Sequence, residues 1–320
     1  MTDPTHRVAV ICGGVGAARF LRGLVDVIDS RAITAIVNVA DDMELHGLHI
    51  SPDIDTVIYT LADEIDPDRG WGLRNETWQA MDTIRRYDEA ADWFSLGDRD
   101  LATHLHRTGR LHAGATISEV TAEIAEAWNL GVRVLPATDD PLRTKVTLAE
   151  SGDEVDFQRY FVGHRHDVAI SDVRFDGADD ARATSPTIDA ILQADAVIIA
   201  PSNPIVSIAP VLAVNGLSDA ISSRTGPTIA ISPIVGGAAL KGPAARMLSE
   251  LGHDASALGV ARLFSDITDV FVIDDVDAGA AGAIAEAGIT PYVTDTIMSD
   301  PAAAARLARA TLSAAGIRNK

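Results

Sequence analysis

Short apolar runs alternate with amphipathic stretches at the start of the chain. Val8–Cys12 and Ile33–Val39 have the length and composition of buried strands. Between them, apolar residues from Phe20 to Ile28 recur at the spacing of one helix face. A second helix is predicted to begin at Ser51 and Pro52, because proline is tolerated in a first helical turn.

The same alternation returns in the second half of the chain. Apolar runs at Ala196–Ala200, Thr228–Ser232 and Asp269–Ile273 are each followed by a helical pattern, and the last helix is predicted over Ala302–Ala315. Strands that alternate with helices in this way predict a parallel sheet covered by helices on both faces.

The alternation is interrupted in the middle of the chain. Thr144–Glu150 and Glu154–Val162 read as the two strands of a hairpin. We therefore predict a doubly wound, mostly parallel, Rossmann-like α/β core with an inserted, smaller α/β subdomain. The core would comprise residues 1–65 and 175–320, and the subdomain residues 66–174.

Composition narrows the class of protein. A chain of 320 residues with 47% hydrophobic and 22% charged residues can bury a large core. Its single cysteine, Cys12, excludes a disulfide framework and a cysteine-based zinc site, and fits a reducing compartment. The net charge of −20 argues against non-specific binding to nucleic acid or to an anionic membrane. The uncharged stretch Ala196–Asn215 contains three prolines and is no membrane helix. We expect a cytoplasmic protein.

A glycine-rich turn between the first strand and the first helix is a candidate phosphate site. Backbone N–H groups in such a turn can approach a phosphate, and the helix N-terminus adds partial positive charge. The dinucleotide fingerprint is imperfect, since Arg19 stands at its third glycine and Asn38 replaces the ribose-binding acid. A tight turn without a ligand is the alternative. The residues concerned are Gly13, Gly14, Val15 and Gly16.

Four aspartates are candidate ligands of Mg²⁺. Asp41 and Asp42 follow the second strand, at the edge of an α/β sheet where ligands bind, and Asp53 and Asp55 lie in the next helix. Alternatively, the latter two simply complement the helix dipole. Residues two apart on a helix point about 200° apart, so we expect one of the two to face a ligand and the other to face solvent.

Three further segments combine polar groups at predicted loop positions. They are Leu96–His104, Pro201–Ser207 and Ser232–Gly237, the last followed by Lys241, which is either a phosphate-binding cation or an exposed lysine. The alternative for Leu96–His104 is a capped surface helix with solvated charges. His104 and His106 are two apart, but no third ligand stands at a zinc spacing.

These motifs occur in an order that resembles a known family. The ordered segments are Gly13–Gly16, Ser51–Thr56, Leu96–Asp100, Pro201–Pro204 and Ser232–Ile234. Together they closely resemble the 2-phospho-L-lactate transferase family of coenzyme F-420 biosynthesis, whose actinobacterial branch is described as a phosphoenolpyruvate transferase. The likeness runs from about Val8 to Ser299.

The resemblance implies a reaction. The ribityl hydroxyl of the deazaflavin Fo would attack the phosphorus that carries lactate or enolpyruvate in a guanylylated donor, and GMP would leave with the help of Mg²⁺. Asp55 and Arg99 match family positions that contact the deazaflavin, with Asp55 as the candidate catalytic residue or, alternatively, a metal ligand. Ser202 and Asn203 are weaker candidates for the same substrate.

Several choices stay open at this point. The high Ala and Arg content suggests a GC-rich genome and so, by resemblance, the phosphoenolpyruvate branch. The main alternative is a nucleotide-sugar-binding regulatory protein of the gluconeogenesis-factor-like type, and a dehydrogenase is a further one, disfavoured by Arg19. A homodimer is the default expectation for oligomeric state.

Overall fold

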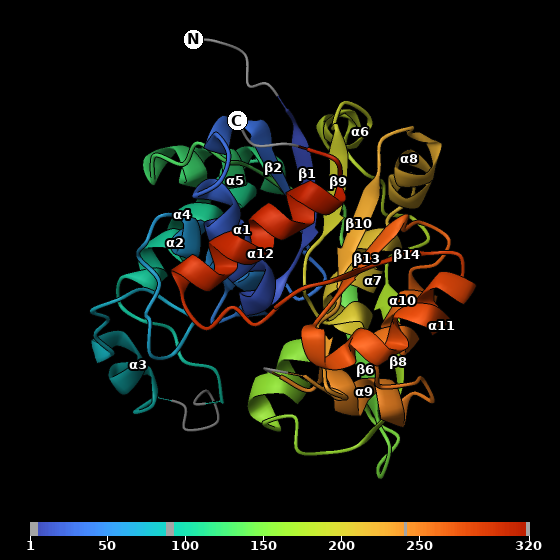
Figure 1. The fold of residues 1–320 in the computed structure, drawn as a ribbon. Helices are drawn as coiled ribbons and strands as arrows, with labels where there is room; N and C mark the ends of the chain where they lie inside the picture. Colours follow the sequence, from blue (N-terminus) through green and yellow to red (C-terminus); the bar gives the residue numbers. More distant parts are fainter. Residues whose placement is uncertain (1–5, 88–92, 240–241, 318–320) are drawn as a thin grey trace.

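The computed structural model describes residues 6–87, 93–239 and 242–317. At its centre is a seven-stranded sheet in which every pair of neighbours is parallel (Figure 1). In spatial order its strands are β14 (Thr290–Val293), β13 (Val270–Ile273), β10 (Thr228–Ile231), β9 (Ala196–Ile199), β1 (Val8–Cys12), β2 (Ile33–Val37) and β5 (Arg133–Pro136). This order confirms the predicted doubly wound, Rossmann-like α/β class.

The apolar runs of the sequence form the middle of this sheet. Every residue of β1, β9 and β10 is buried, as a strand covered on both faces requires. Val8 is in register with Ile33 on one side and with Ala196 on the other. Strands that begin 188 positions apart are thus direct neighbours, and their carboxyl ends reach one edge together.

Helices cover the sheet. Phe20, Leu21 and Leu24 of the first helix join the main hydrophobic core with Leu307 and Leu312 of the last, and these two helices lie against each other on the near face in Figure 1. The helices are α1 (Gly14–Val25), α2 (Pro52–Leu61), α3 (Gln79–Ile84), α4 (Asp100–His112), α5 (Ile117–Ala127), α6 (Ser185–Leu192), α7 (Ala209–Leu212), α8 (Leu217–Ser223), α9 (Ala244–Glu250), α10 (Ala257–Leu263), α11 (Ala281–Glu286) and α12 (Pro301–Ala314).

The strand order reverses at β1. From β1 the chain continues to β2 and β5 on one side, and it later returns to β9 on the other side. In open α/β sheets a ligand crevice forms outside the carboxyl ends of the strands at such a reversal. The loops after β1, β2 and β9 are therefore the ones that the topology assigns to a binding site.

Small antiparallel sheets extend this edge. β3 (Met43–Leu45) and β4 (Leu48–Ile50) form a hairpin directly after the loop that follows β2. A second sheet has the order β7 (Glu154–Asp156), β6 (Arg143–Leu148), β8 (Ile170–Asp176), and β11 (Ile234–Val235) pairs with β12 (Ala238–Ala239). The predicted hairpin is present, but its second strand is wrong beyond Asp156. There the chain turns helical, and Phe157 and Tyr160 pack into a core of their own.

Two elements within residues 66–174, the range of the predicted insertion, also belong to the central sheet and its core. β5 lies inside that range and forms one edge of the central sheet, and α5 contributes Val120 and Ile124 to the main core. The sequence pattern did not predict β5. The strand has only four residues and begins with an exposed arginine, Arg133, which an edge strand can accommodate. The small sheet β7-β6-β8 is an excursion between β5 and β9.

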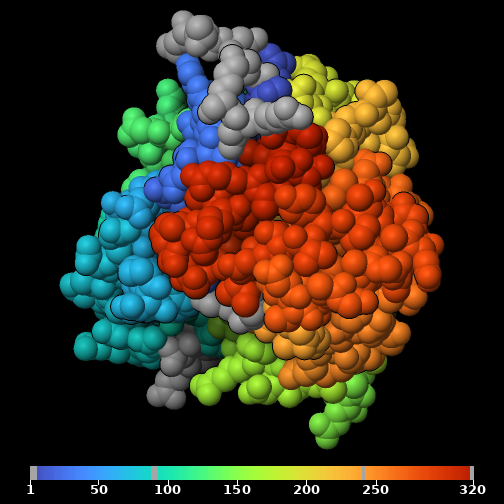
Figure 2. Space-filling model, in the orientation of Figure 1, coloured from blue at the N-terminus to red at the C-terminus, as the bar shows by residue number. Residues whose placement is uncertain are grey.

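The surface also joins distant parts of the sequence. In the space-filling view, the C-terminal helix in red lies across the N-terminal segments in blue (Figure 2). Within the described ranges, none of the helices has both the length and the apolar character that crossing a bilayer would need.

Candidate active site

The glycine turn after β1 is packed tightly against its neighbours. Gly14 opens α1 with φ 71°, in the left-handed region, and its N–H donates to Asp53 Oδ1 at 2.8 Å. A Cβ on Gly13 would lie 2.6 Å from Asp53 Oδ2, and one on Gly16 would lie 2.4 Å from the carbonyl oxygen of Pro201. Packing alone therefore requires glycine at both of these positions.

The amides that remain for an anion are fewer than the sequence suggested. Gly13 is buried, and the Gly14 N–H is engaged by Asp53. Val15 and Gly16 are partly exposed, and their N–H groups lie in the first turn of α1, where a helix has no acceptor of its own. Of the predicted set Gly13, Gly14, Val15 and Gly16, the last two present free amides at the sheet edge.

Asp53 connects the glycine turn to the acidic loop after β2. Its Oδ2 accepts a hydrogen bond from Asn38 Nδ2 at 3.0 Å. Burial raises the pKa of Asp53 to about 6, with a further contribution from the charge of Asp42, although the bonds from Asn38 and Gly14 oppose the shift. Burial and the charge of Asp53 likewise raise the pKa of Asp41 well above its usual range. The protein holds several carboxylates together against their mutual repulsion.

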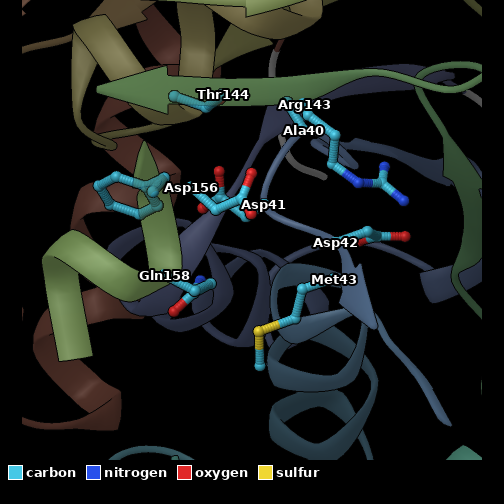
Figure 3. Close-up of a pocket in the computed structure, with 9 residues that line it drawn as sticks. Ala40, Asp41, Asp42, Met43, Arg143, Thr144, Asp156 and Gln158 are labelled. Carbon is cyan, nitrogen blue, oxygen red and sulfur yellow. The ribbon is translucent and has the colours of Figure 1, made fainter. Parts of the chain in front are cut away.

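A small cavity beside this loop is lined by oxygen atoms without partners. Its volume is about 10 Å³, roughly that of one water-sized group (Figure 3). Asp41 Oδ1, Asp42 Oδ1 and Thr144 Oγ1 are buried and make no hydrogen bond in the described structure. Buried polar atoms are normally paired, so these three oxygens are candidate donors to a bound group. The cavity lining is Ala40, Asp41, Asp42, Met43, Arg143, Thr144, Asp156, Phe157 and Gln158.

The other oxygen of Asp42 is firmly held. Asp42 Oδ2 lies 2.9 Å from His49 Nε2 and accepts a hydrogen bond from Ser51 Oγ at 2.8 Å. The N–H of His49 donates in turn to Thr108 Oγ1 of α4 at 2.8 Å. These contacts leave Oδ1 of Asp42 as the free oxygen, in a fixed orientation.

This donor set fits Mg²⁺. The cation prefers carboxylate and hydroxyl oxygens and usually keeps several waters. Of the four predicted ligands, Asp41 and Asp42 line this cavity, and Asp53 lies outside its lining but close enough for its charge to raise the pKa of Asp41. The fourth, Asp55, belongs to a different cluster.

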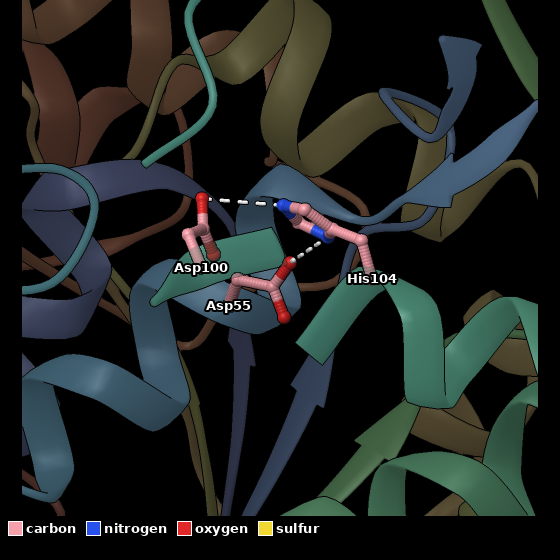
Figure 4. Close-up of side chains that lie close together, drawn as sticks. All are labelled: Asp55, Asp100 and His104. Atoms are coloured by element: carbon pink, nitrogen blue, oxygen red, sulfur yellow. Dashed lines mark ion pairs between the residues drawn. The ribbon is translucent and has the colours of Figure 1, made fainter. Parts of the chain in front are cut away.

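Asp55 pairs with an arginine that the sequence analysis did not single out. Arg107 of α4 is fully buried, and its two terminal nitrogens donate to the two oxygens of Asp55, Nη1 to Oδ2 at 3.1 Å and Nη2 to Oδ1. His104 lies between Asp55 and Asp100, with Nδ1 3.8 Å from Asp55 Oδ2 and Nε2 3.2 Å from Asp100 Oδ2 (Figure 4). Tyr59 donates its hydroxyl proton within the cluster, with Asp100 Oδ1 at 2.7 Å.

Both aspartates of α2 are buried, contrary to the expectation that one would face solvent. Asp53 is 6% exposed and Asp55 5% exposed. The helix starts between two packed neighbours, α1 on one side and α4 on the other, so both faces of its first turn meet protein. Asp53 and Asp55 point in opposite directions and each meets a protein group, Gly14 for Asp53 and Arg107 for Asp55. Neither side chain faces solvent.

Asp55, Asp100 and His104 are close enough to share a metal ion, but their charges are already balanced. Ligand atoms of the three lie within 4.8 Å of one another. The Nη1 of Arg107 lies 3.1 Å from Asp55 Oδ2 and 3.3 Å from His104 Nδ1. A divalent cation at this point would meet a buried guanidinium, so the cluster does not fit a metal.

Arg99, predicted to contact the same substrate as Asp55, is held elsewhere. Its Nη2 donates to Glu64 at 3.1 Å and its Nη1 to the carbonyl of Arg74 at 2.5 Å. The turn that carries it is fixed by Glu76, which accepts hydrogen bonds from the N–H groups of Arg99 and Asp100. Arg99 is 40% exposed, so it can still reach a ligand from the rim.

Ser202 and Asn203 have local partners. Ser202 Oγ donates to the carbonyl of Gly13 at 2.8 Å and so ties the loop after β9 to the glycine turn. Asn203 Oδ1 caps the segment Pro204–Ile208 by accepting from the N–H of Ile205 at 3.0 Å. The structure thus brings Ser202 to the glycine turn. Lys241 lies outside the described residues.

The predicted segment Leu96–His104 already included Asp100 and His104, whereas Arg107 lies just beyond it and was not predicted. Asp100, His104 and Arg107 recur at helical spacing after the Leu96–Asp100 motif. A polar stripe of this kind is usually a solvated face, and here it is buried against α2. Thr144 carried no comparable signal, because it reaches the cavity through the small sheet.

Comparison with known proteins identifies the family of the chain. The family model described as 2-phospho-L-lactate transferase CofD matches residues 8–310. A phosphoenolpyruvate transferase of Mycobacterium tuberculosis (strain ATCC 25618 / H37Rv) is 40% identical over 333 residues, covering 97% of this chain and 99% of the relative. One of Mycobacterium avium (strain 104) is 38% identical over 339 residues, with the same coverage of both chains.

Two solved structures share the fold. Both are of protein BH3568 from Bacillus halodurans. One has a TM-score of 0.64 at 20% identity and covers 96% of this chain and 99% of its own. The other, described as a member of the upf0052 family, has a TM-score of 0.63 at 18% identity and covers 97% and 100%. At this identity the likeness extends to the fold alone.

Proposed function

The chain belongs to the 2-phospho-L-lactate transferase family, and on that premise we propose that it makes the phosphodiester precursor of coenzyme F-420. The ribityl hydroxyl of the deazaflavin Fo is the acceptor. The donor is a guanylylated phosphoenolpyruvate or 2-phospholactate. The acceptor oxygen forms a bond to the phosphorus that carries the three-carbon acid, the bond from that phosphorus to the GMP oxygen breaks, and the hydroxyl proton passes to solvent.

One observation carries the proposal. Free first-turn amides of Val15 and Gly16 and the unpartnered oxygens of Asp41 and Asp42 lie on loops that the topology brings to the same edge of the sheet, where the strand order reverses. A diphosphate needs both: N–H donors for its oxygens and a cation for its charge. A Mg²⁺ held by Asp41, Asp42 and Asp53 would neutralise charge on the donor diphosphate.

The chain's own groups then have separate tasks. The amides of Val15 and Gly16 hold phosphate oxygens, because their hydrogens are free of intrahelical partners. Asp55 accepts a hydrogen bond from the acceptor hydroxyl and orients its oxygen. Arg99 contributes from the rim of the site. Positioning and charge neutralisation dominate phosphoryl transfer, so the chain need not form a covalent intermediate.

Phosphoenolpyruvate is the donor acid that we favour. The relatives that match almost the whole chain are named phosphoenolpyruvate transferases. The same names disfavour the nucleotide-sugar-binding regulator, the alternative that shares the glycine turn.

The decisive test is GMP release, followed by mass spectrometry with Mg²⁺, Fo and each guanylylated donor in turn. We expect Fo-dependent GMP together with a phosphodiester product that retains the enolpyruvyl group. Faster transfer from the phospholactyl donor would reverse the donor assignment. No transfer from either donor by folded, Mg²⁺-supplied protein would reject the proposed activity.

A further inference from the structure

We propose that Arg107 is a positioning residue for the acceptor side of the site. In this role, which rests on the function proposed above, its guanidinium clamps Asp55 so that the carboxylate serves the acceptor hydroxyl and not the metal. The juxtaposition that suggests this is a fully buried, two-point ion pair directly beside, but separate from, the acidic cavity.

The first step is the geometry of the pair. Both oxygens of Asp55 face the fork of Arg107, which is the bidentate arrangement that fixes a carboxylate in plane and direction. Each carboxylate oxygen has a second lone pair, so Asp55 can still accept one further hydrogen bond. Arg107 thus fixes the orientation of the Asp55 carboxylate and leaves one lone pair on each oxygen available to a substrate.

The second step is the burial of the cation. Arg107 is 0% exposed, and a guanidinium is found in such a place only with an anionic partner. Asp55 is that partner, and the charge of Asp42 stabilises the guanidinium further. A cation fixed at this position repels a second one, which separates the acceptor cluster from the cation site formed by Asp41 and Asp42.

The third step is the support of Arg107 itself. It belongs to α4, whose first turn is held by Glu76 and whose Asp100 contacts Tyr59 and His104. The next residue, Thr108, accepts the N–H of His49, which orients Asp42. One turn of α4 therefore holds both carboxylate clusters at a fixed separation, as transfer between two bound substrates requires.

The test compares Arg107→Lys with Arg110→Lys. Arg110 lies on the same helix and pairs with Glu123 on the surface, so it is a matched control. Arg107→Lys keeps the charge and loses the fork. We expect kcat/KM for Fo to fall 10- to 100-fold, while the KM for the donor and the affinity for Mn²⁺, measured by titration without substrates, change less than twofold. Arg110→Lys should change none of these.

A double-mutant cycle separates positioning from mere stability. Asp55→Asn and Asp55→Asn with Arg107→Gln should have equal residual transfer, because Arg107 acts only through Asp55, and the paired amides avoid a lone buried charge. Arg107→Lys protein with the wild-type kcat/KM for Fo, or an equal loss in donor KM and Mn²⁺ affinity, would overturn the positioning role while the function stood. Absence of Fo-dependent transfer by the wild type would overturn both.

Discussion

Asp53 and Asp55 lie two residues apart in the first turn of α2, both are buried, and they serve opposite sides of the helix. Asp53 accepts the N–H of Gly14 at 2.8 Å, and Asp55 pairs with Arg107 across the helix. The first turn of α2 therefore contributes one carboxylate to the glycine turn and one to the buried cluster around Arg107.

Replacing Asp41 should stabilise the metal-free protein at alkaline pH. Burial raises the pKa of Asp41 above its ordinary value of 3.8 and raises that of Asp53 to about 6. The folded protein therefore binds more protons than the unfolded chain in this range, so stability falls as pH rises from about 4 through the folded pKa values. Asp41→Asn removes one of the repelling charges.

Thermal melting in the presence of EDTA measures whether Asp41→Asn raises or lowers the stability of the metal-free protein at each pH. Asp41→Asn should melt above the wild type at pH 8, and the difference should shrink towards pH 4, where the raised pKa keeps Asp41 protonated in the folded wild type, so that it repels no neighbour. A difference that stays constant with pH would show that charge repulsion is not its cause.

Mg²⁺ should stabilise the wild type and not the Asp42→Asn variant. A ligand that binds only the folded state at 100 times its Kd adds about 2.7 kcal/mol. The loss of Oδ1 of Asp42 as a charged ligand should remove most of the rise in melting temperature. Asp172→Asn, an exposed change on β8, is the control and should keep the full rise. An unchanged response in Asp42→Asn would place the cation elsewhere.

Gly16→Ala should be destabilising, and Gly109→Ala should not. A Cβ at position 16 would lie 2.4 Å from the carbonyl oxygen of Pro201, and overpacking of this kind costs about 1–3 kcal/mol. At Gly109, an exposed position within α4, a Cβ meets nothing within 4 Å, and the change should add about 0.5–1 kcal/mol. Urea unfolding measures both. Equal effects would mean that the close approach of the turn to Pro201 is dispensable.

Arg99→Gln should weaken the binding of the acceptor Fo and have little effect on the stability of the protein. Its pair with Glu64 is partly exposed, and such pairs contribute little to folding. The KM for Fo should rise, while the melting temperature stays within about 2 °C of the wild type. Arg22→Gln, which removes a similarly exposed pair with Asp26, is the control for loss of an arginine and should leave the KM unchanged.

The sequence predicted the fold class because a strand that is buried on both faces of a sheet is a continuous run of apolar residues. Val8–Cys12 and Ala196–Ile199 have nothing polar to place, so their strands and parallel pairing follow from pattern alone. β5 was missed because an edge strand tolerates Arg133. The glycine turn and the acidic loop were predicted to lie at one edge of the sheet because each directly follows a predicted parallel strand.

The sequence could not predict which aspartates belong to which of the two clusters. Nothing in the spacing of Asp53 and Asp55 reveals that α4 packs beside α2, and that contact decides which carboxylate receives a guanidinium. Likewise Arg107 looks like a surface arginine until the helix that carries it is placed. Long-range packing, not local propensity, decides these roles.

The hydrogen bond from Ser202 to Gly13 spans 189 positions and bears on how the protein is made. During synthesis the glycine turn and the acidic loop leave the ribosome well before β9, and contacts between remote segments close slowly. No working site can exist until the chain beyond position 202 has emerged and docked beside β1. In a newly made chain the glycine turn therefore reaches its final packing late, and recovery of the Ser202–Gly13 contact on refolding reports completion of the central sheet.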